Sequence, residues 1–230
     1  QTRRSETRIA WTGKIMISSS TRTAVVTGGS RGLCAAIAAR LAADGFSTVV
    51  NYAGSRERAE AVVADIRAAG GTAIAVQADV SDPHSVTGLF AAAEAAFGPV
   101  EVLVNSASII KLDPFAQSED AVFDALIAVN LKGTFNTLRE AARRMPDGGA
   151  IVTLSTSVVG LNIETYGVYA ATTAAVETMT AILAEEMRGR AITVNAVAPG
   201  PTATELFLEG KPQEVIDKMA KAPPLERLAT

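Results

Sequence analysis

Short apolar runs alternate with helical stretches between residues 22 and 197, a pattern typical of a parallel sheet covered by helices on both faces. Runs rich in β-branched residues predict strands near 22–27, 47–52, 72–78, 100–105, 149–154 and 192–197. Helices are predicted near 32–44, 55–69, 83–97, 119–144 and 165–188. The expected fold class is therefore α/β, a doubly wound, Rossmann-like parallel sheet in a single domain.

Length, charge and cysteine count exclude several classes of protein. A chain of 230 residues is long enough for one domain with a substantial core. Its net charge of −3 argues against a nucleic-acid partner, and no apolar run reaches the ~20 residues of a membrane span. One cysteine excludes an intrachain disulfide, and one cysteine with one histidine argues against a Cys/His metal site. These counts predict a cytoplasmic protein without a metal.

The first twenty residues differ from the rest of the chain. Only Glu6 offsets four basic residues, Arg3, Arg4, Arg8 and Lys14. Organelle transit peptides have a similar composition, but Met16 lies just before a natural-looking start. We interpret residues 1–20 as an upstream extension or a cloning remnant, and residues 21–230 as the one folded domain.

A strand, a glycine loop and a helix follow one another at residues 23–43. The loop reads Thr27-Gly28-Gly29-Ser30-Arg31-Gly32-Leu33-Cys34 and leads into an alanine-rich run. A first glycine permits a tight turn, the next lets backbone N–H groups approach a phosphate, and a helix N-terminus supplies partial positive charge. This order of residues predicts a site for a dinucleotide pyrophosphate.

Four later segments lie at distances that suit the same domain: Asn105-Ser106-Ala107-Ser108, Asn130 within 129–135, Tyr169-Ala-Ala-Thr172-Thr173 and Asn195-Ala-Val-Ala-Pro199-Gly200. Together with the glycine loop, they resemble the short-chain dehydrogenase/reductase family, and in wording its 3-oxoacyl-acyl-carrier-protein reductases. The resemblance runs from Arg22 to the end. Residues 223–230 resemble the segment before the family's last helix and strand, so the last strand is expected to be missing.

The resemblance implies a nicotinamide cofactor. Its expected contacts are Gly28, Ser30, Arg31, Gly32, Leu33, Asn51, Tyr52, Arg56, Asp79, Val80, Asn105, Ser106, Ala107, Pro199 and Gly200. The second strand ends without the carboxylate that favours NAD, whereas Asn51, Ser55 and Arg56 can donate to a 2′-phosphate, with Arg31 as a second cation. NADP(H) is therefore the expected cofactor. Asp79 is equally compatible with a capping role.

The resemblance also implies the catalytic residues. Tyr169 would act as general acid, Asn130 would hold a water or a helix carbonyl in the proton relay, and Ser157 would orient the substrate oxygen. Ser155 and Thr156 remain alternatives to Ser157. Thr173 stands where the family has a lysine. A unit charge ~4–5 Å away is worth roughly 3–4 kcal/mol at an effective dielectric near 20, or about 2–3 pKa units. Neither Lys111 nor Lys132 has the helix register to replace it.

Two more departures lie at the cofactor. Cys34 and Ser108 stand where the family has glycines, and each is expected to cost on the order of 1–3 kcal/mol through crowding. A cysteine near a helix N-terminus also suits a redox sensor with a depressed pKa; the plainer interpretation is a small buried residue in place of glycine.

The expected function is NADP(H)-dependent hydride transfer that reduces a ketone of the 3-oxoacyl type to a secondary alcohol, as in fatty acid biosynthesis. The alternative is a catalytically impaired relative, with Thr173 in place of lysine, that acts as a dinucleotide sensor or an assembly partner. A third is an oligomerisation subunit that binds no nucleotide. The segment 201–212, which would select a small-molecule or acyl-thioester substrate, has only a generic apolar stretch at 206–208.

Helices 119–144 and 165–188 carry more apolar residues than one core-facing stripe needs, which predicts a homodimer or homotetramer. These residues are Val122, Phe123, Leu126, Val176 and Met179.

Overall fold

The computed structural model describes residues 22–208 and 212–229. The predicted boundary at residue 20, and the extension before it, lie outside these residues. No helix in the described part of the chain combines the length and apolar character needed to cross a membrane.

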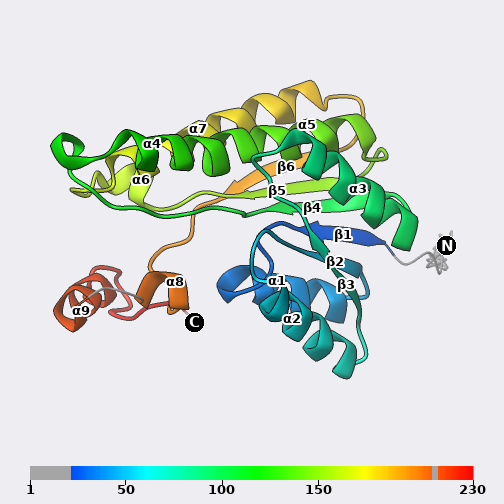
Figure 1. Cartoon of the computed structure of the whole chain (residues 1–230), viewed down its shortest axis with the longest axis horizontal. Helices are drawn as coiled ribbons and strands as arrows, with labels where there is room; N and C mark the ends of the chain where they lie inside the picture. Colours follow the sequence, from blue (N-terminus) through cyan, green and yellow to red (C-terminus); the bar gives the residue numbers. More distant parts are fainter. Residues whose placement is uncertain (1–21, 209–211, 230) are drawn as a thin grey trace, which may run out of the picture.

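Strands and helices alternate along most of the described chain (Figure 1). The strands are β1 (Thr23–Val26), β2 (Ser47–Tyr52), β3 (Thr72–Gln77), β4 (Val100–Asn105), β5 (Ala150–Leu154) and β6 (Thr193–Val197). The longer helices are α1 (Gly32–Ala43), α2 (Arg56–Ala68), α3 (Pro83–Phe97), α5 (Gly133–Arg144) and α7 (Gly167–Glu186). These bounds agree with the predicted ranges, except that the range 119–144 is divided.

The strands form one parallel sheet in the order β3-β2-β1-β4-β5-β6. The chain moves outward from β1 to β3, then returns to the centre and continues from β4 to β6. This reversal between β1 and β4 is the point where α/β sheets of this kind hold ligands at the carboxyl ends of their strands. The predicted doubly wound α/β fold is confirmed, and β6 is the edge strand of the described sheet.

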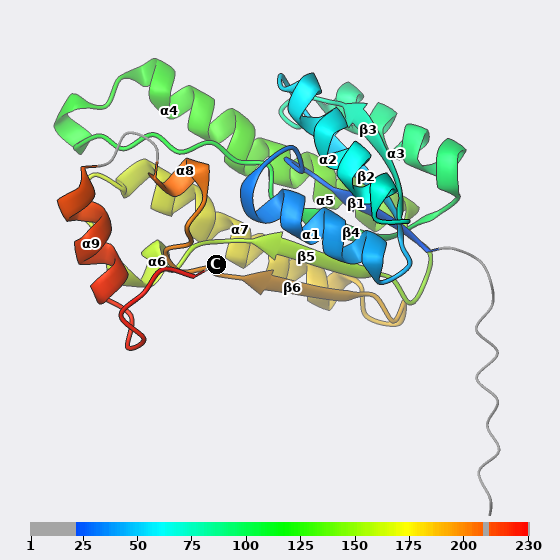
Figure 2. The same ribbon diagram turned by 90° about the horizontal axis from the view of Figure 1, so that it is seen from below.

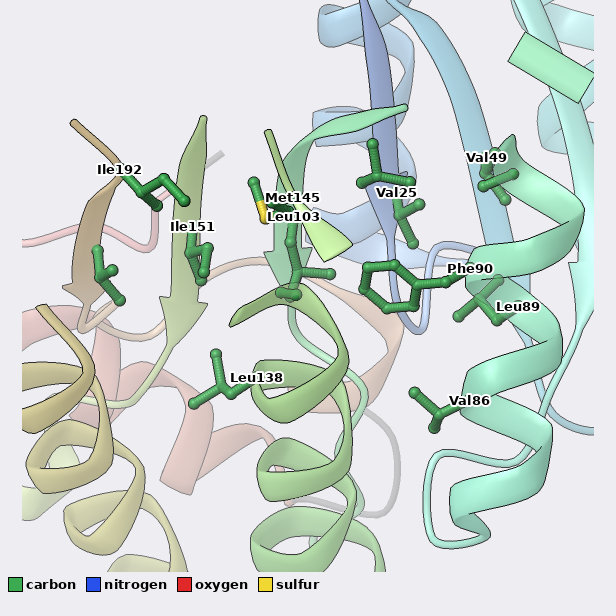
Figure 3. Packing of buried hydrophobic residues seen from close by; sticks show 14 of the residues in the cluster. Val25, Val49, Val86, Leu89, Phe90, Leu103, Leu138, Met145, Ile151 and Ile192 are labelled. Atoms are coloured by element: carbon green, nitrogen blue, oxygen red, sulfur yellow. The ribbon is translucent and has the colours of Figure 1, made fainter. Parts of the chain in front are cut away.

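Both faces of the sheet are covered by helices. Successive side chains on β1 point to opposite faces, so neighbouring residues belong to different cores. Val25 belongs to the core under α3, α5 and α7, while Val26 belongs to the core under α1 and α2. Figures 1 and 2 show these two groups of helices on opposite faces. In the larger core, Phe90 of α3 and Leu138 of α5 pack toward Leu103 of β4 (Figure 3).

Residues 119–144 form three pieces where one helix was predicted. Helix α4 (Asp120–Leu126) passes into the π-helical turn η2 (Ile127–Lys132) before α5 begins at Gly133. A Cβ at Gly133 would lie 2.6 Å from Cγ2 of Val80, so the helix passes close to the end of β3 at that point. The sequence pattern also missed η1 (Phe115–Gln117), α6 (Val158–Leu161), α8 (Glu205–Leu208) and α9 (Gln213–Lys221).

Candidate active site

A cavity of about 530 Å³ lies at the carboxyl ends of the strands. It extends from the glycine loop after β1, past the ends of β2 and β4, to the segment after β5 and the first turns of α7. All the predicted cofactor and catalytic residues line this one cavity except Arg56. Segments far apart in the sequence therefore meet there as predicted.

The glycine loop has the shape that a phosphate-binding loop needs. Gly28 and Gly32 have φ angles of +66° and +56°, which L side chains rarely adopt. A Cβ at Gly28 would also lie 3.0 Å from Cα of Ala107. Helix α1 follows without a side-chain cap from Arg31, so its first N–H groups are available to an anion. The loop fits the pyrophosphate of a dinucleotide.

Hydrogen bonds hold the end of β4 against this loop. The N–H groups of Ser106 and Ala107 donate to the Thr27 hydroxyl at 2.9 and 3.0 Å. Asn105 is buried, and its amide donates to Thr134 Oγ1 at 3.0 Å while its Oδ1 accepts from the Thr137 hydroxyl at 2.7 Å. Sequence reasoning missed both threonines, which lie one turn apart at the start of α5.

Cys34 is accommodated by a small polar neighbour. Its Sγ lies 2.7 Å from Oγ of Ser106. Burial raises the pKa of the Cys34 thiol, and this outweighs the hydrogen bond to Ser106 and the charge of Arg31, which act to lower it. The structure contradicts a depressed pKa at Cys34, so the redox-sensor interpretation is wrong on this point. Ser108 is exposed and lines the cavity.

At the adenosine end, Asn51 is a positioning residue. Its amide nitrogen donates to the carbonyl groups of Val76 and Ala78 at 3.3 and 3.0 Å, and its Oδ1 accepts from the N–H of Gly28 at 3.3 Å. The prediction that Asn51 donates to a phosphate is wrong, because its buried amide holds β3 and the glycine loop in place.

The prediction that Arg56 contacts the cofactor is also wrong. Its guanidinium lies 3.8 Å from the Glu60 carboxylate on the outer side of α2, 78% exposed, and it does not line the cavity. Among the described residues, the cation that lines the cavity is Arg31. Asp79 accepts from the N–H and hydroxyl of Ser81 in a turn, so the interpretation of Asp79 as a helix cap is wrong; Asp82 caps α3.

Tyr169 lies on the first turn of α7, and no cation of the described residues shifts its pKa. Thr173 is one turn further along, 4% exposed, and its hydroxyl donates to the carbonyl groups of Tyr169 and Ala170. Among the described residues, neither Lys111 nor Lys132 lines the cavity. Thr173 therefore contributes no charge to the site.

A second tyrosine, which sequence reasoning missed, lies beside Tyr169. The ring of Tyr166 is 6.3 Å from that of Tyr169 in an edge-on arrangement and also lines the cavity. Burial raises the pKa of Tyr169 above its ordinary value, and Tyr166 raises it further. Both tyrosines are therefore protonated at neutral pH, which suits a proton donor but not a proton acceptor.

Asn130 connects the wall of the cavity to α7. Its Oδ1 accepts from the N–H of Ile109 at 2.8 Å, and its Nδ2 donates to the carbonyl of Ile109 at 2.9 Å and to Thr172 Oγ1 at 3.3 Å. The buried side chain thus holds a loop backbone, where the sequence led us to expect a water or a helix carbonyl.

The three candidate hydroxyls after β5 all line the cavity but have different partners. Ser155 donates to Glu177 Oε1 at 2.5 Å, and Thr156 accepts from the N–H of Val158 at 3.4 Å. Ser157 precedes α6, and its side chain makes no capping hydrogen bond. The Ser155 proton is thus engaged by Glu177, whereas the Thr156 and Ser157 hydroxyls both keep a proton that can be donated to a substrate.

The outer end of the cavity is apolar. Its walls come from the loop after β4, from α6, and from α8 and α9: Ile109, Ile110, Val158, Leu161, Ile163, Phe207 and Met219. Among the described lining residues, only Arg31, Asp79 and Glu205 carry a charge. A substrate at this end would meet hydrocarbon surface and the hydroxyls of Tyr166, Tyr169 and Ser157.

Comparison with known proteins gives the family. The sequence model described as short chain dehydrogenase matches residues 22–214. The chain belongs to this family.

Two relatives and one solved structure illustrate the similarity. A chloroplastic NADPH-dependent aldehyde reductase-like protein of Arabidopsis thaliana is 44% identical, over 90% of this chain and 82% of its own. A 3-oxoacyl-(acyl-carrier-protein) reductase of Staphylococcus aureus is 39% identical, over 90% of this chain and 85% of its own. The crystal structure of a short chain dehydrogenase from Burkholderia cenocepacia in complex with NADP is 37% identical, with a TM-score of 0.84 over 90% of this chain and 84% of that one.

Proposed function

We propose that the protein is an NADP(H)-dependent reductase of aldehydes or ketones that carry an apolar substituent. The observation that carries this proposal is the single cavity in which a glycine cradle, the hydroxyls of Tyr169 and Ser157, and an apolar outer end meet. The similarity to an NADPH-dependent aldehyde reductase-like protein and to a 3-oxoacyl reductase supports the same class of reaction.

Each residue has a distinct part in this proposal. NADPH, when bound, supplies the hydride to the carbonyl carbon. Tyr169 donates its phenolic proton to the carbonyl oxygen, and the Ser157 hydroxyl orients that oxygen. Asn130 positions the wall beside them through Ile109 and α7. The apolar outer wall excludes water from the carbonyl and accepts the substituent.

The preference for NADP(H) over NAD(H) rests on charge. The end of β2 presents no carboxylate that would repel a 2′-phosphate, and Arg31 lines the cavity. A structural neighbour described as a complex with NADP is consistent with this preference. Among carbonyl substrates, neutral ones suit the outer end best, and a 3-oxoacyl thioester stays within this class.

We also infer a homodimer or homotetramer. The expectation was based on five residues. Two of them, Leu126 and Val176, are buried inside the protomer and therefore no longer support an interface. Phe123 on α4 and Phe135 on α5 are nearly half exposed, and Ile182 on α7 is 55% exposed, so these helices still present apolar surface. A cytoplasmic location and a part in fatty acid biosynthesis stay predictions; one relative is named as chloroplastic.

The test combines binding and turnover. Titration with NADPH should enhance nicotinamide fluorescence, and NADPH oxidation should then follow the addition of an apolar aldehyde or a 3-oxoacyl ester. Tyr169→Phe should keep the fluorescence change and lose turnover, because it removes only the proton donor. Binding without turnover in the unaltered protein would favour the dinucleotide sensor, for which Thr173 is the supporting observation. If NADPH does not bind, the proposal fails.

A further inference from the structure

A short segment after β6 crosses the cavity from the substrate end toward α2. We call residues 201–205 the strap. Pro201, Thr202, Thr204 and Glu205 line the same cavity as the glycine loop. The strap passes close over that loop, because a Cβ at Gly32 would lie 3.5 Å from the Thr204 side chain. Figure 2 shows α8, which begins within the strap, beside the carboxyl ends of the strands.

The two ends of the strap are held in different ways. At one end, the backbone of Ala229 pairs with it: Ala229 donates to the carbonyl of Pro201 at 2.9 Å and accepts from the N–H of Ala203 at 2.8 Å. At the other end, Arg58 in the first turn of α2 donates to both carboxylate oxygens of Glu205, at 2.8 and 3.0 Å. This bidentate ion pair joins segments 147 residues apart.

The Arg58–Glu205 ion pair is better placed than most exposed pairs to fix the position of the strap. A bidentate arginine–carboxylate contact fixes orientation as well as distance. Helix α8, which starts at Glu205, has only four residues, and α9 has no buried residue, so neither supplies a large packed surface to hold the strap. Ser55, which lines the cavity, lies three residues before Arg58. The pair therefore spans the rim at the adenosine end.

We propose that Arg58 and Glu205 form a latch that keeps the strap closed over the dinucleotide and thereby slows cofactor release. Both are positioning residues, and the effect on release rests on the proposed use of NADP(H). An exposed pair contributes little free energy, so the expected effect is roughly two- to fivefold. At about 1 M salt, where charges are screened within ~3 Å, the effect should largely disappear.

The first test uses the free protein. Hydrogen exchange of peptides within residues 199–208 should be roughly two- to fivefold faster in Glu205→Gln and in Arg58→Gln. Exchange should return toward that of the unaltered protein when the charges are swapped, Arg58→Glu with Glu205→Arg. The matched control is Asp44→Asn, which breaks a 2.9 Å pair with Arg40 on α1; both carboxylates are 47% exposed. This control should leave exchange at the strap unchanged.

The second test measures release. Bound NADPH is displaced by excess NADP⁺ in a stopped-flow instrument while nicotinamide emission is followed. Both single variants should release NADPH roughly two- to fivefold faster than the unaltered protein and the Asp44→Asn control.

Three outcomes would overturn the latch. One is unchanged exchange at the strap in both variants, which decides the matter even if NADPH does not bind and the proposed function fails. Another is faster exchange with unchanged release. The third is opposite effects of the two variants on release, since Glu205→Gln alone slowing release would mean that the carboxylate repels the phosphates.

Discussion

Thr173 stands where the family has a lysine, and the substitution Thr173→Lys tests how much the missing charge matters to the site. Residues four apart on a helix have Cβ atoms about 5–6 Å apart, so a lysine at this position would bring its charge to Tyr169. At about 5 Å and an effective dielectric near 20, that charge favours the tyrosinate by about 3 kcal/mol, or about two pKa units. It would act against burial and Tyr166, which raise the pKa of Tyr169.

The expected gain is in turnover and in its pH dependence. General acid–base catalysis contributes about 10²–10⁴ to rates, which sets the upper range of the increase in NADPH-dependent reduction. Alcohol oxidation needs the tyrosinate and rises with pH up to the pKa of Tyr169. Its limb should therefore move down by about two pH units in the lysine variant. Because the pKa of Tyr169 is raised above its ordinary value of about 10, initial rates measured from pH 5 to about 11 in both directions should show the rising limb of the lysine variant displaced toward lower pH.

Thr173→Met is the matched control, because methionine has an unbranched side chain without charge. It should give neither the gain nor the shift. The reasoning is refuted if the unaltered protein already turns over at about 1–10³ s⁻¹, a range common among enzymes, and lysine adds nothing. An equal gain from methionine would also refute it, since packing rather than charge would then be responsible.

Three further changes test other parts of the structure. Arg31→Ala should reduce NADPH affinity more than NADH affinity while Arg56→Ala changes neither, as measured by fluorescence titration; an Arg56 effect as large as that of Arg31 would contradict the placement of Arg56 outside the cavity. Gly28→Ala should weaken NADPH binding at least tenfold, because φ is +66° and the new Cβ would lie 3.0 Å from a backbone atom after β4; binding within twofold of the unaltered protein would argue against the glycine cradle. Phe90→Ala should lower the free energy of unfolding by about 3–5 kcal/mol in urea denaturation, because the side chain is fully buried; a loss under about 1 kcal/mol would mean that this core is loosely packed.

Local patterns predicted the sheet and the place of the site. The central strands are buried on both faces, so they read as continuous apolar runs such as Ala24–Val26 and can be located without knowledge of their neighbours. Most motif residues follow strand ends, which parallel strands bring to one edge of the sheet, while Asn130, Tyr169 and Thr173 reach the same edge from η2 and α7. This is why all the predicted site residues except Arg56 line one cavity.

The errors concern side-chain direction and long-range pairing. Asn51 and Arg56 are both near the end of β2, but the inward turn of the Asn51 amide depends on the carbonyl groups of Val76 and Ala78, which no local pattern brings beside it. The partner of Arg58 is 147 residues away. The π-helical turn before Gly133 and the close approach of Gly133 to Val80 likewise join segments that no local pattern relates.

The two ends of the cavity differ in how much of the fold depends on them. Asn51 and Asn105 at the inner end hold strands and the glycine loop together, so a change there disturbs both folding and binding. The outer end is built from loop residues and from α6, α8 and α9, and α9 buries no side chain. Substitutions at the outer end can therefore alter the range of substrates with little loss of stability. Within one cavity, the outer end can thus change during evolution while the inner end, on which the fold depends, stays constant.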